Sequence, residues 1–187
     1  VDPGGPAICP APPADAPRNR LGLARWLTDP AHPLTARVAV NRFWQQIFGT
    51  GIVKTAEDFG SQGQWPSNPE LLDWLAVDFR ENGWDRKRMI KLLVTSATYR
   101  QTADFNEKAA ALDADNTLLW RQTPRRLEAE AVRDAMLTVS GQLNRAIGGP
   151  SFRPFDAIPF PANTYAIADK IGPEFNRRTV YRMNVNS

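Results

Sequence analysis

The chain has 187 residues and a net charge of +3, from 23 Lys and Arg residues against 20 Asp and Glu residues. This length fits one domain with irregular ends. A domain of this size buries about 70% of the surface that its unfolded chain exposes. Because basic and acidic residues are interspersed, the charge does not favour nucleic-acid binding. The single Cys9 excludes an internal disulfide. No apolar run reaches the ~20 residues that span a membrane.

Residues 1–17 read VDPGGPAICPAPPADAP and contain six prolines. They offer too little apolar surface to offset the entropy of ordering, so we predict a disordered linker. From Asn19 the pattern changes, because Leu23 and Trp26 recur at helical spacing until Asp29-Pro30 ends the run.

A second helix is predicted to open at His32-Pro33, since Pro at the first helical position loses no hydrogen bond. Its apolar residues include Val40, Trp44 and Ile47, and Gly49 fits its C-terminal end. We expect His32 to be a helix cap or a surface residue.

Two further helices are predicted after a loop over 52–66. Ser67 and Glu70 have capping-box spacing ahead of the run ELLDWLAVDF. Asp85 can cap the next helix, in which Met89 and Leu93 face inward.

The last predicted helix follows a polar connection over 101–115. Val132, Met136, Val139 and Leu143 are spaced by four, three and four residues, which indicates a helix with an apolar stripe. We therefore predict a mainly α fold, a compact orthogonal bundle of about five helices over 18–145. The residues 146–187 read as an irregular extension.

Elimination removes several kinds of site. One His and one Cys cannot supply the usual ligands of a zinc site, so neither a metal nor another cofactor is predicted in this chain. The run GTGIVKT lacks P-loop spacing, and its glycines follow a helix instead of opening one.

Two polar sets at helical spacing are the main candidates for a site, and each has two interpretations. Buried Arg must be paired, which favours a structural Arg–carboxylate network between helices. The alternative is a pocket for an anionic or polar ligand. The sets are Arg37, Asn41, Arg42 and Gln45 in the second helix, and Arg126, Glu130, Arg133 and Asp134 in the last.

The loop over 52–66 carries the best candidates for catalysis. Glu57 and Asp58 are adjacent carboxylates, and paired carboxylates can hydrolyse a glycosidic bond when they flank it. Trp65, beside Pro66, could stack on a sugar ring. A solvated or Arg-braced loop is the structural alternative.

A basic run leaves nucleic-acid binding as a further hypothesis, although helix propensity and surface solvation already account for it. The run contains Arg86, Lys87, Arg88 and Lys91, beside Trp84.

Longer runs carry a resemblance to a known family. LARWLTDPAHPLTARVAVNRFWQQIFGTGIVKTAEDFGSQGQWPSNPELLDWLAVDF is followed by SATYRQT, NTLLWRQTPRRLEAEAVRDAML, SGQLN, GGPS and RRTVY. Together these resemble domain-of-unknown-function family 1553, which is abundant in planctomycetes and related bacteria. The likeness is close over residues 20–151 and looser beyond.

The resemblance implies in what kind of larger protein this chain occurs, and it does not imply a reaction. Family members are typically the C-terminal part of large exported proteins that also hold a cytochrome-c-like haem module, so any haem would lie elsewhere in the full protein. Asn68 stands where His is common and Thr102 where Ser is common. Relatives usually continue beyond Tyr181, so a truncated copy is expected.

Two functions follow as hypotheses. The first is a noncatalytic interaction or scaffolding module of an exported protein, which contacts neighbouring domains or a polysaccharide and has no membrane span. The alternative is part of a hydrolase that acts on polysaccharide, with Asp58 and Glu57 as acid and base and with Arg37 and Asn41 orienting the substrate.

Overall fold

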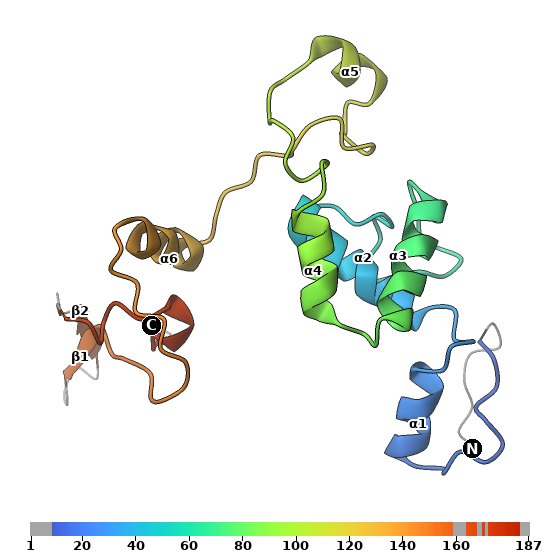
Figure 1. Ribbon diagram of the computed structural model, residues 1–187, viewed down its shortest axis with the longest axis horizontal. Helices are drawn as coiled ribbons and strands as arrows, with labels where there is room; N and C mark the ends of the chain where they lie inside the picture. Colours follow the sequence, from blue (N-terminus) through green and yellow to red (C-terminus); the bar gives the residue numbers. More distant parts are fainter. Residues whose placement is uncertain (1–8, 159–163, 168–169, 171, 184–187) are drawn as a thin grey trace. The chain divides into compact units, whose positions relative to one another are not determined.

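The computed structural model describes residues 9–158, 164–167, 170 and 172–183, and Figure 1 shows their course. Helices make up most of the regular structure in these residues, which confirms the prediction of a mainly α fold. The elements are α1 (Arg20–Leu27), α2 (Thr35–Phe48), α3 (Pro69–Glu81), α4 (Arg86–Val94), α5 (Glu107–Leu112), α6 (Ala129–Val139), β1 (Phe155–Ile158), β2 (Thr164–Ile167) and the 3₁₀ helix η1 (Thr179–Tyr181).

The contacts divide the chain into two compact units, Val1–Arg125 and Arg126–Ser187. This division falls just before α6, inside the range 18–145 that the sequence suggested as one helical domain. Each unit is therefore described by itself.

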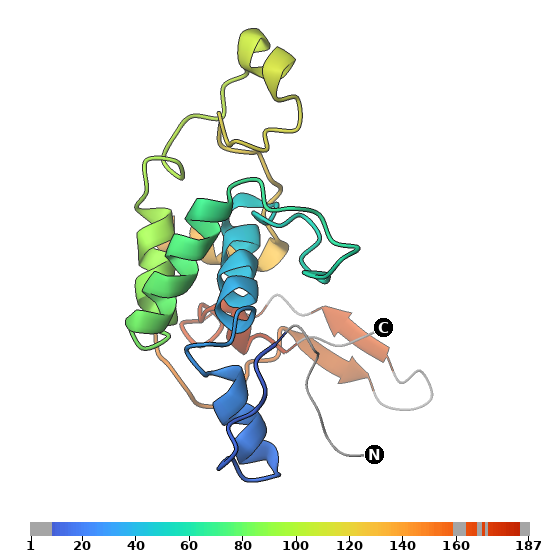
Figure 2. The same cartoon turned by 90° about the vertical axis from the view of Figure 1, so that its right-hand side faces the viewer.

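The core of the first unit lies between α2, α3 and α4, which stand side by side in both views (Figure 1, Figure 2). The apolar stripes predicted from helical spacing are the ones that meet there. Burying each large side chain stabilises the unit by about 1.5–3 kcal/mol. The buried residues include Val40, Trp44, Phe48, Leu72, Leu75, Phe79, Met89 and Leu93.

Short polar side chains begin most of these helices. Asn68 accepts a hydrogen bond from Leu71 N at 3.0 Å, so it caps α3 in place of the predicted Ser67. Pro69 then occupies the first turn, where its missing N–H costs nothing. The predicted cap of α4 is confirmed, because the Asp85 carboxylate accepts from two backbone N–H groups.

The Pro-rich segment contacts α1 over its described part, while residues 1–8 lie outside the described residues. Trp26 donates its indole N–H to Pro10 O at 2.7 Å. A Cβ on Gly22 would lie 1.9 Å from Pro17 O, so only Gly permits this approach.

The second unit contains elements that the sequence did not indicate. We predicted irregular structure over 146–187, yet β1 and β2 pair antiparallel there, from Phe155 opposite Ile167 to Ile158 opposite Thr164. Strands of four residues carry too few alternating positions to be recognised. The helix α5 was not predicted either, because its six residues are too few to show helical periodicity.

The apolar stripe of α6 does not form a core among the described residues. Met136 is 69% exposed and Val139 is 89% exposed, and Val132 is also exposed. The helix is predicted correctly, and its apolar stripe is exposed. None of the helices in the described part of the chain has the length and hydropathy needed to cross a bilayer.

Candidate functional site

Asn41 is a brace within the core of the first unit. Its side chain is fully buried, donates to Val53 O at 3.0 Å and accepts from Val53 N at 2.9 Å. The amide thus pairs both backbone groups of a buried residue, as a neighbouring strand would. Gly51 lies against it, since a Cβ there would lie 2.7 Å from Asn41 Nδ2. Because the side chain is fully buried, it is not open to a ligand.

Arg37 lies on the same helix but joins α2 to α3. Its Nε donates to Asp73 Oδ1 at 2.6 Å, and a terminal nitrogen donates to Pro33 O. The hydrogen bond from Arg37 is the main reason that the pKa of Asp73 is lowered, although burial opposes it. The same bond raises the pKa of Arg37. This pair is the Arg–carboxylate contact expected between helices.

The other members of the first polar set stand apart. Arg42 reaches Glu57 at 3.4 Å, with both side chains largely exposed, so the contact adds little stability. Gln45 makes no side-chain hydrogen bond among the described residues. Arg37, Asn41 and Arg42 therefore make three separate contacts from one helix and do not form a common network.

A small hollow opens beside the start of α2. It encloses about 260 Å³ and is lined by the 30–33 turn, by α2 and by α3, including His32, Arg37, Asp73 and Arg80. Arg80 donates to Pro30 O at 2.8 Å, which ties the turn to α3. Two guanidinium groups and one carboxylate thus share the wall, and each already has a partner.

His32 was predicted to be a helix cap or a surface residue. It caps α2, and its side chain is buried. Its Nδ1 accepts from the backbone N–H groups of Leu34 and Thr35 at 3.3 Å, so the helix begins at Thr35 and not at Pro33. These bonds place the proton of the neutral ring on Nε2, which has no partner among the described residues. No described carboxylate contacts Nε2, so the relay of a Ser-His-acid triad is not formed.

The two loop carboxylates serve separate local purposes. Asp58 Oδ1 accepts from Gly60 N at 2.7 Å, and Asp58 O accepts from Thr55 Oγ1 at 2.9 Å, which closes a turn. Glu57 faces Arg42 at the surface. The structure therefore uses Asp58 to shape the loop and does not aim the two carboxylates at one point.

Trp65 stands on the same loop and is 91% exposed. Its neighbours are fixed, because Gln64 N donates to Thr55 Oγ1 at 2.9 Å and Ser67 N donates to Ile52 O at 2.8 Å. The exposed indole ring of Trp65, on a loop held by these hydrogen bonds, is accessible to a sugar ring.

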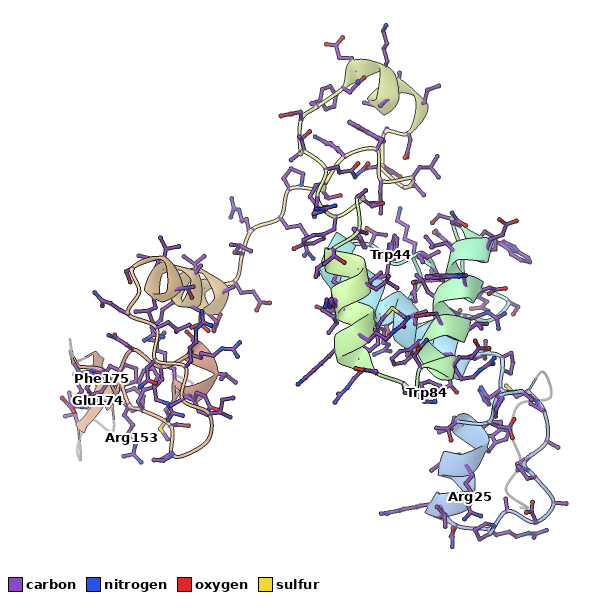
Figure 3. The ribbon with its side chains drawn as sticks, in the orientation of Figure 1. Arg25, Trp44, Trp84, Arg153, Glu174 and Phe175 are labelled. Carbon is purple, nitrogen blue, oxygen red and sulfur yellow. The ribbon has the colours of Figure 1, made fainter. Side chains whose placement is uncertain are left out.

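The second unit contains its own polar network, which joins α6 to η1. Arg133 donates to Arg177 O at 2.9 Å and to Thr179 Oγ1 at 3.1 Å, and it also bonds Phe175 O, at the segment labelled in Figure 3. Asp134 Oδ1 accepts from the backbone N–H and the hydroxyl of Thr179 at 2.7 and 2.6 Å.

These contacts change the acidity of Asp134. The hydrogen bond from the Thr179 hydroxyl is the largest cause of its lowered pKa, while burial opposes the shift. Arg178, 3.7 Å from Oδ2, and Arg133 lower the pKa further. Arg126 and Glu130, predicted in the same set, are exposed and take no part in this network.

The sequence motifs GGPS and RRTVY meet in this unit, which spacing alone did not reveal. Arg177 donates to Pro150 O at 2.8 Å and also to Gly148 O, and its guanidinium lies 3.8 Å from the centre of the Tyr181 ring. Gly148 N donates to Tyr181 Oη at 2.8 Å. The two motifs therefore pack together, and Arg177 joins them through the carbonyl groups of Gly148 and Pro150.

The basic run on α4 is partly neutralised. Arg88 binds both carboxylate oxygens of Asp78 on α3, which raises the pKa of Arg88. Trp84, at the turn between α3 and α4 (Figure 3), packs edge-on against Phe79 at 5.3 Å and is partly buried. The run therefore offers no open aromatic ring beside it for a base to stack on.

Polar groups that brace helices, together with an exposed apolar stripe, define a helical module without an assembled catalytic centre in its described residues. No three His, Cys, Asp or Glu side chains of the described ranges converge as a metal site requires. Residues 19–187 match the family described as PSD1: Protein of unknown function (DUF1553), so the chain belongs to that family. No curated protein and no solved structure matches the chain.

Proposed function

We propose that this chain is a noncatalytic interaction module of a larger exported multidomain protein, in which a neighbouring domain of the same polypeptide covers α6. The exposed stripe of α6 carries the proposal. Val132, Met136 and Val139 recur at helical spacing and face solvent. Covering each would contribute about 1.5–3 kcal/mol, which gives the helix a reason to keep them.

The polar residues support the same proposal. Asn41 is hydrogen-bonded to Val53, Arg37 is paired with Asp73, and Asp134 is hydrogen-bonded to Thr179. The polar side chains that could serve a catalytic mechanism thus hold helices and loops together. The family resemblance adds the expected setting of an exported protein with further domains.

Binding in trans tests the proposal. The natural polypeptide is produced without this segment, the segment is added separately, and the dissociation constant is measured by calorimetry. We expect Met136→Glu to weaken binding at least about tenfold, because it removes apolar contact and places a charge in the interface; tenfold corresponds to ~1.4 kcal/mol.

A matched control is Leu23→Glu, which makes the same kind of change at an exposed position of α1. Circular dichroism confirms that both variants remain folded. If the segment does not bind the remainder of the polypeptide, or if both variants bind as the unchanged chain does, the proposed role of α6 is wrong.

A second candidate function, action on a polysaccharide, is favoured by Trp65 on the loop that holds Asp58. It predicts that Trp65→Ala weakens binding to a soluble polysaccharide and that Asp58→Asn abolishes its hydrolysis. Reducing-sugar release by the full chain measures the reaction. Equal release by the Asp58→Asn variant would remove the catalytic role.

A further inference from the structure

The hollow beside the start of α2 has walls that are tied to one another. It lies in the first unit, between α2, α3 and the turn ahead of α2, and encloses about 260 Å³. Arg80 of α3 donates to Pro30 O at 2.8 Å, which fixes the turn against α3. Arg37 of α2 binds both Asp73 of α3 and Pro33 O. The space is therefore formed before a ligand arrives, and binding does not have to order its walls.

Polar atoms of this wall keep hydrogen-bonding capacity that the fold does not use. Within the described residues, Nη2 of Arg37 and Nη2 of Arg80 donate no hydrogen bond, and Oδ2 of Asp73 accepts none. The three side chains are 36%, 29% and 53% exposed, in that order. Neither guanidinium group has a nitrogen that is buried without a partner. The free donors and the free acceptor therefore reach solvent, on side chains that line the hollow.

The rest of the lining provides packing. The ring of His32 is edge-on to Trp26, with 4.7 Å between the ring centres, and its Nε2 is closed to solvent. The histidine is therefore not counted among the groups that face a ligand. A few polar side chains in an otherwise apolar wall are typical of sites for small molecules. The apolar lining consists of Pro30, Ala31, Pro33, Ala36, Ala76 and Val77.

The charges of the polar wall nearly cancel. Arg37 is paired with Asp73 at 2.6 Å, and Arg80 lies 3.9 Å from the carboxylate of Glu81. Such a wall does not favour a charged ligand, but it presents donors and an acceptor together. A hydroxyl group matches this combination, because it accepts a hydrogen bond from a guanidinium group while it donates one to a carboxylate.

The size of the hollow limits the ligand to one ring. Its volume of about 260 Å³ lies just below the ~300–1,000 Å³ of pockets that hold drug-sized molecules. Three polar side chains around so small a space require a ligand with several polar atoms. A simple amide offers only two such atoms and would leave part of the wall unused. A sugar ring carries hydroxyl groups on adjacent carbons, and its C–H groups suit the small apolar side chains.

We propose that this hollow binds a single neutral sugar residue. Its hydroxyl groups accept hydrogen bonds from Arg37 and Arg80 and donate one to Asp73, while its C–H groups contact Val77 and the neighbouring small side chains. The site uses neither the stripe of α6 nor the loop carboxylates, and it requires no reaction. It is therefore a binding site in addition to the surfaces considered above.

An NMR titration of the full chain with methyl β-glucopyranoside tests the site. The signals followed are the Nε–H groups of Arg37 and Arg80 and the methyl groups of Val77. We expect all of them to shift with one dissociation constant of about 1–10 mM, because a ligand of this size gains little free energy on binding. The Nε–H of Arg88, which binds Asp78 at another position of α3, is the internal reference and should not shift.

Two charged sugars of similar size test the neutrality of the site. The methyl glycosides of glucuronate and glucosamine carry one negative and one positive charge. We expect neither to bind more than about threefold more tightly than the neutral glucoside, because the charges of the wall nearly cancel. A larger preference for either one would assign the hollow to a charged ligand and overturn the proposal.

Two variants and a matched control locate the binding. Asp73→Ala removes the acceptor and should weaken binding of the glucoside at least about fivefold. Val77→Trp, at an exposed position of the lining, fills the space and should abolish the shifts of the two Arg signals. Asp78→Ala removes another Arg-bound carboxylate of α3 and should leave the affinity unchanged. Circular dichroism confirms that each variant is folded.

The absence of shifts with the neutral glucoside, or unchanged binding in either Asp73→Ala or Val77→Trp, would overturn the proposal. The other proposals are tested by different residues, since Met136→Glu measures the stripe of α6 and Trp65→Ala and Asp58→Asn measure the loop. Each of the three can therefore fail alone.

Discussion

The two units distribute their apolar and charged residues differently. In the first, the stripes of α2, α3 and α4 face one another, and ion pairs such as Arg37–Asp73 lie at the edge of the core. In the second, the stripe of α6 faces solvent, and Arg133 and Asp134 of this helix bind Thr179 in η1. The first unit is therefore held by its own core, whereas the covering of α6 that we propose would add apolar burial to the second.

The largest expected effect concerns the buried brace of the first unit. Asn41→Ala leaves Val53 N and O buried without partners, so we expect the free energy of unfolding to fall by about 2–5 kcal/mol. Urea unfolding followed by tryptophan fluorescence measures it. Gln45→Ala, one turn later on the same helix, is the control and should cost less than about 0.5 kcal/mol. Equal losses in the two variants would show that Asn41 is not the brace described here.

An intermediate effect is expected in the second unit, where it should depend on pH. The folded pKa of Asp134 is lowered below its unfolded value of about 3.9. The stabilisation is therefore fully present above about pH 5 and is lost as the pH falls through the folded pKa. Asp134→Asn should destabilise the unit by about 1–3 kcal/mol at pH 7 and by progressively less toward pH 2.

The amide signal of Thr179 follows this transition, because its N–H donates to Asp134. Asp73→Asn serves as the control, since it removes a carboxylate of the first unit and should leave the Thr179 signal unchanged. A difference between the chain and Asp134→Asn that stayed constant from pH 7 to pH 2 would contradict the assigned cause.

The smallest effect is expected for the exposed pair between α2 and α3. A double-mutant cycle of Arg37→Ala and Asp73→Ala should give a coupling energy of about 0.2–1 kcal/mol, because both side chains are more than a third exposed. The coupling should decrease in 0.5 M salt. A coupling of several kcal/mol that salt did not affect would place this pair within the core instead of at its edge.

Helical periodicity predicted α2, α3 and α4 well because these helices are long and each buries one face. The inward residues Leu75, Phe79 and Met89 could be identified from spacing alone. The same reasoning also predicted α6, but spacing shows only that a helix has an apolar face and does not show what covers that face. Met136 illustrates the difference.

The candidate site was only partly accessible to sequence reasoning. Arg133 and Asp134 stood in one of the predicted polar sets, but their shared contact Thr179 lies 46 and 45 positions further along the chain, and no local pattern connects them. Asn41 was grouped with Arg37, Arg42 and Gln45 in one polar set, because helical spacing cannot show that Val53 returns to it.

Amide hydrogen exchange across α6 tests the central claim most directly. It is measured in this chain alone and in the larger polypeptide that we propose carries it. We expect the amides of residues 132–139 to exchange at least about tenfold more slowly in the larger protein, while those of α2, already inside a core, change little. Equal exchange of α6 in both would contradict a partner that covers Met136 and Val139.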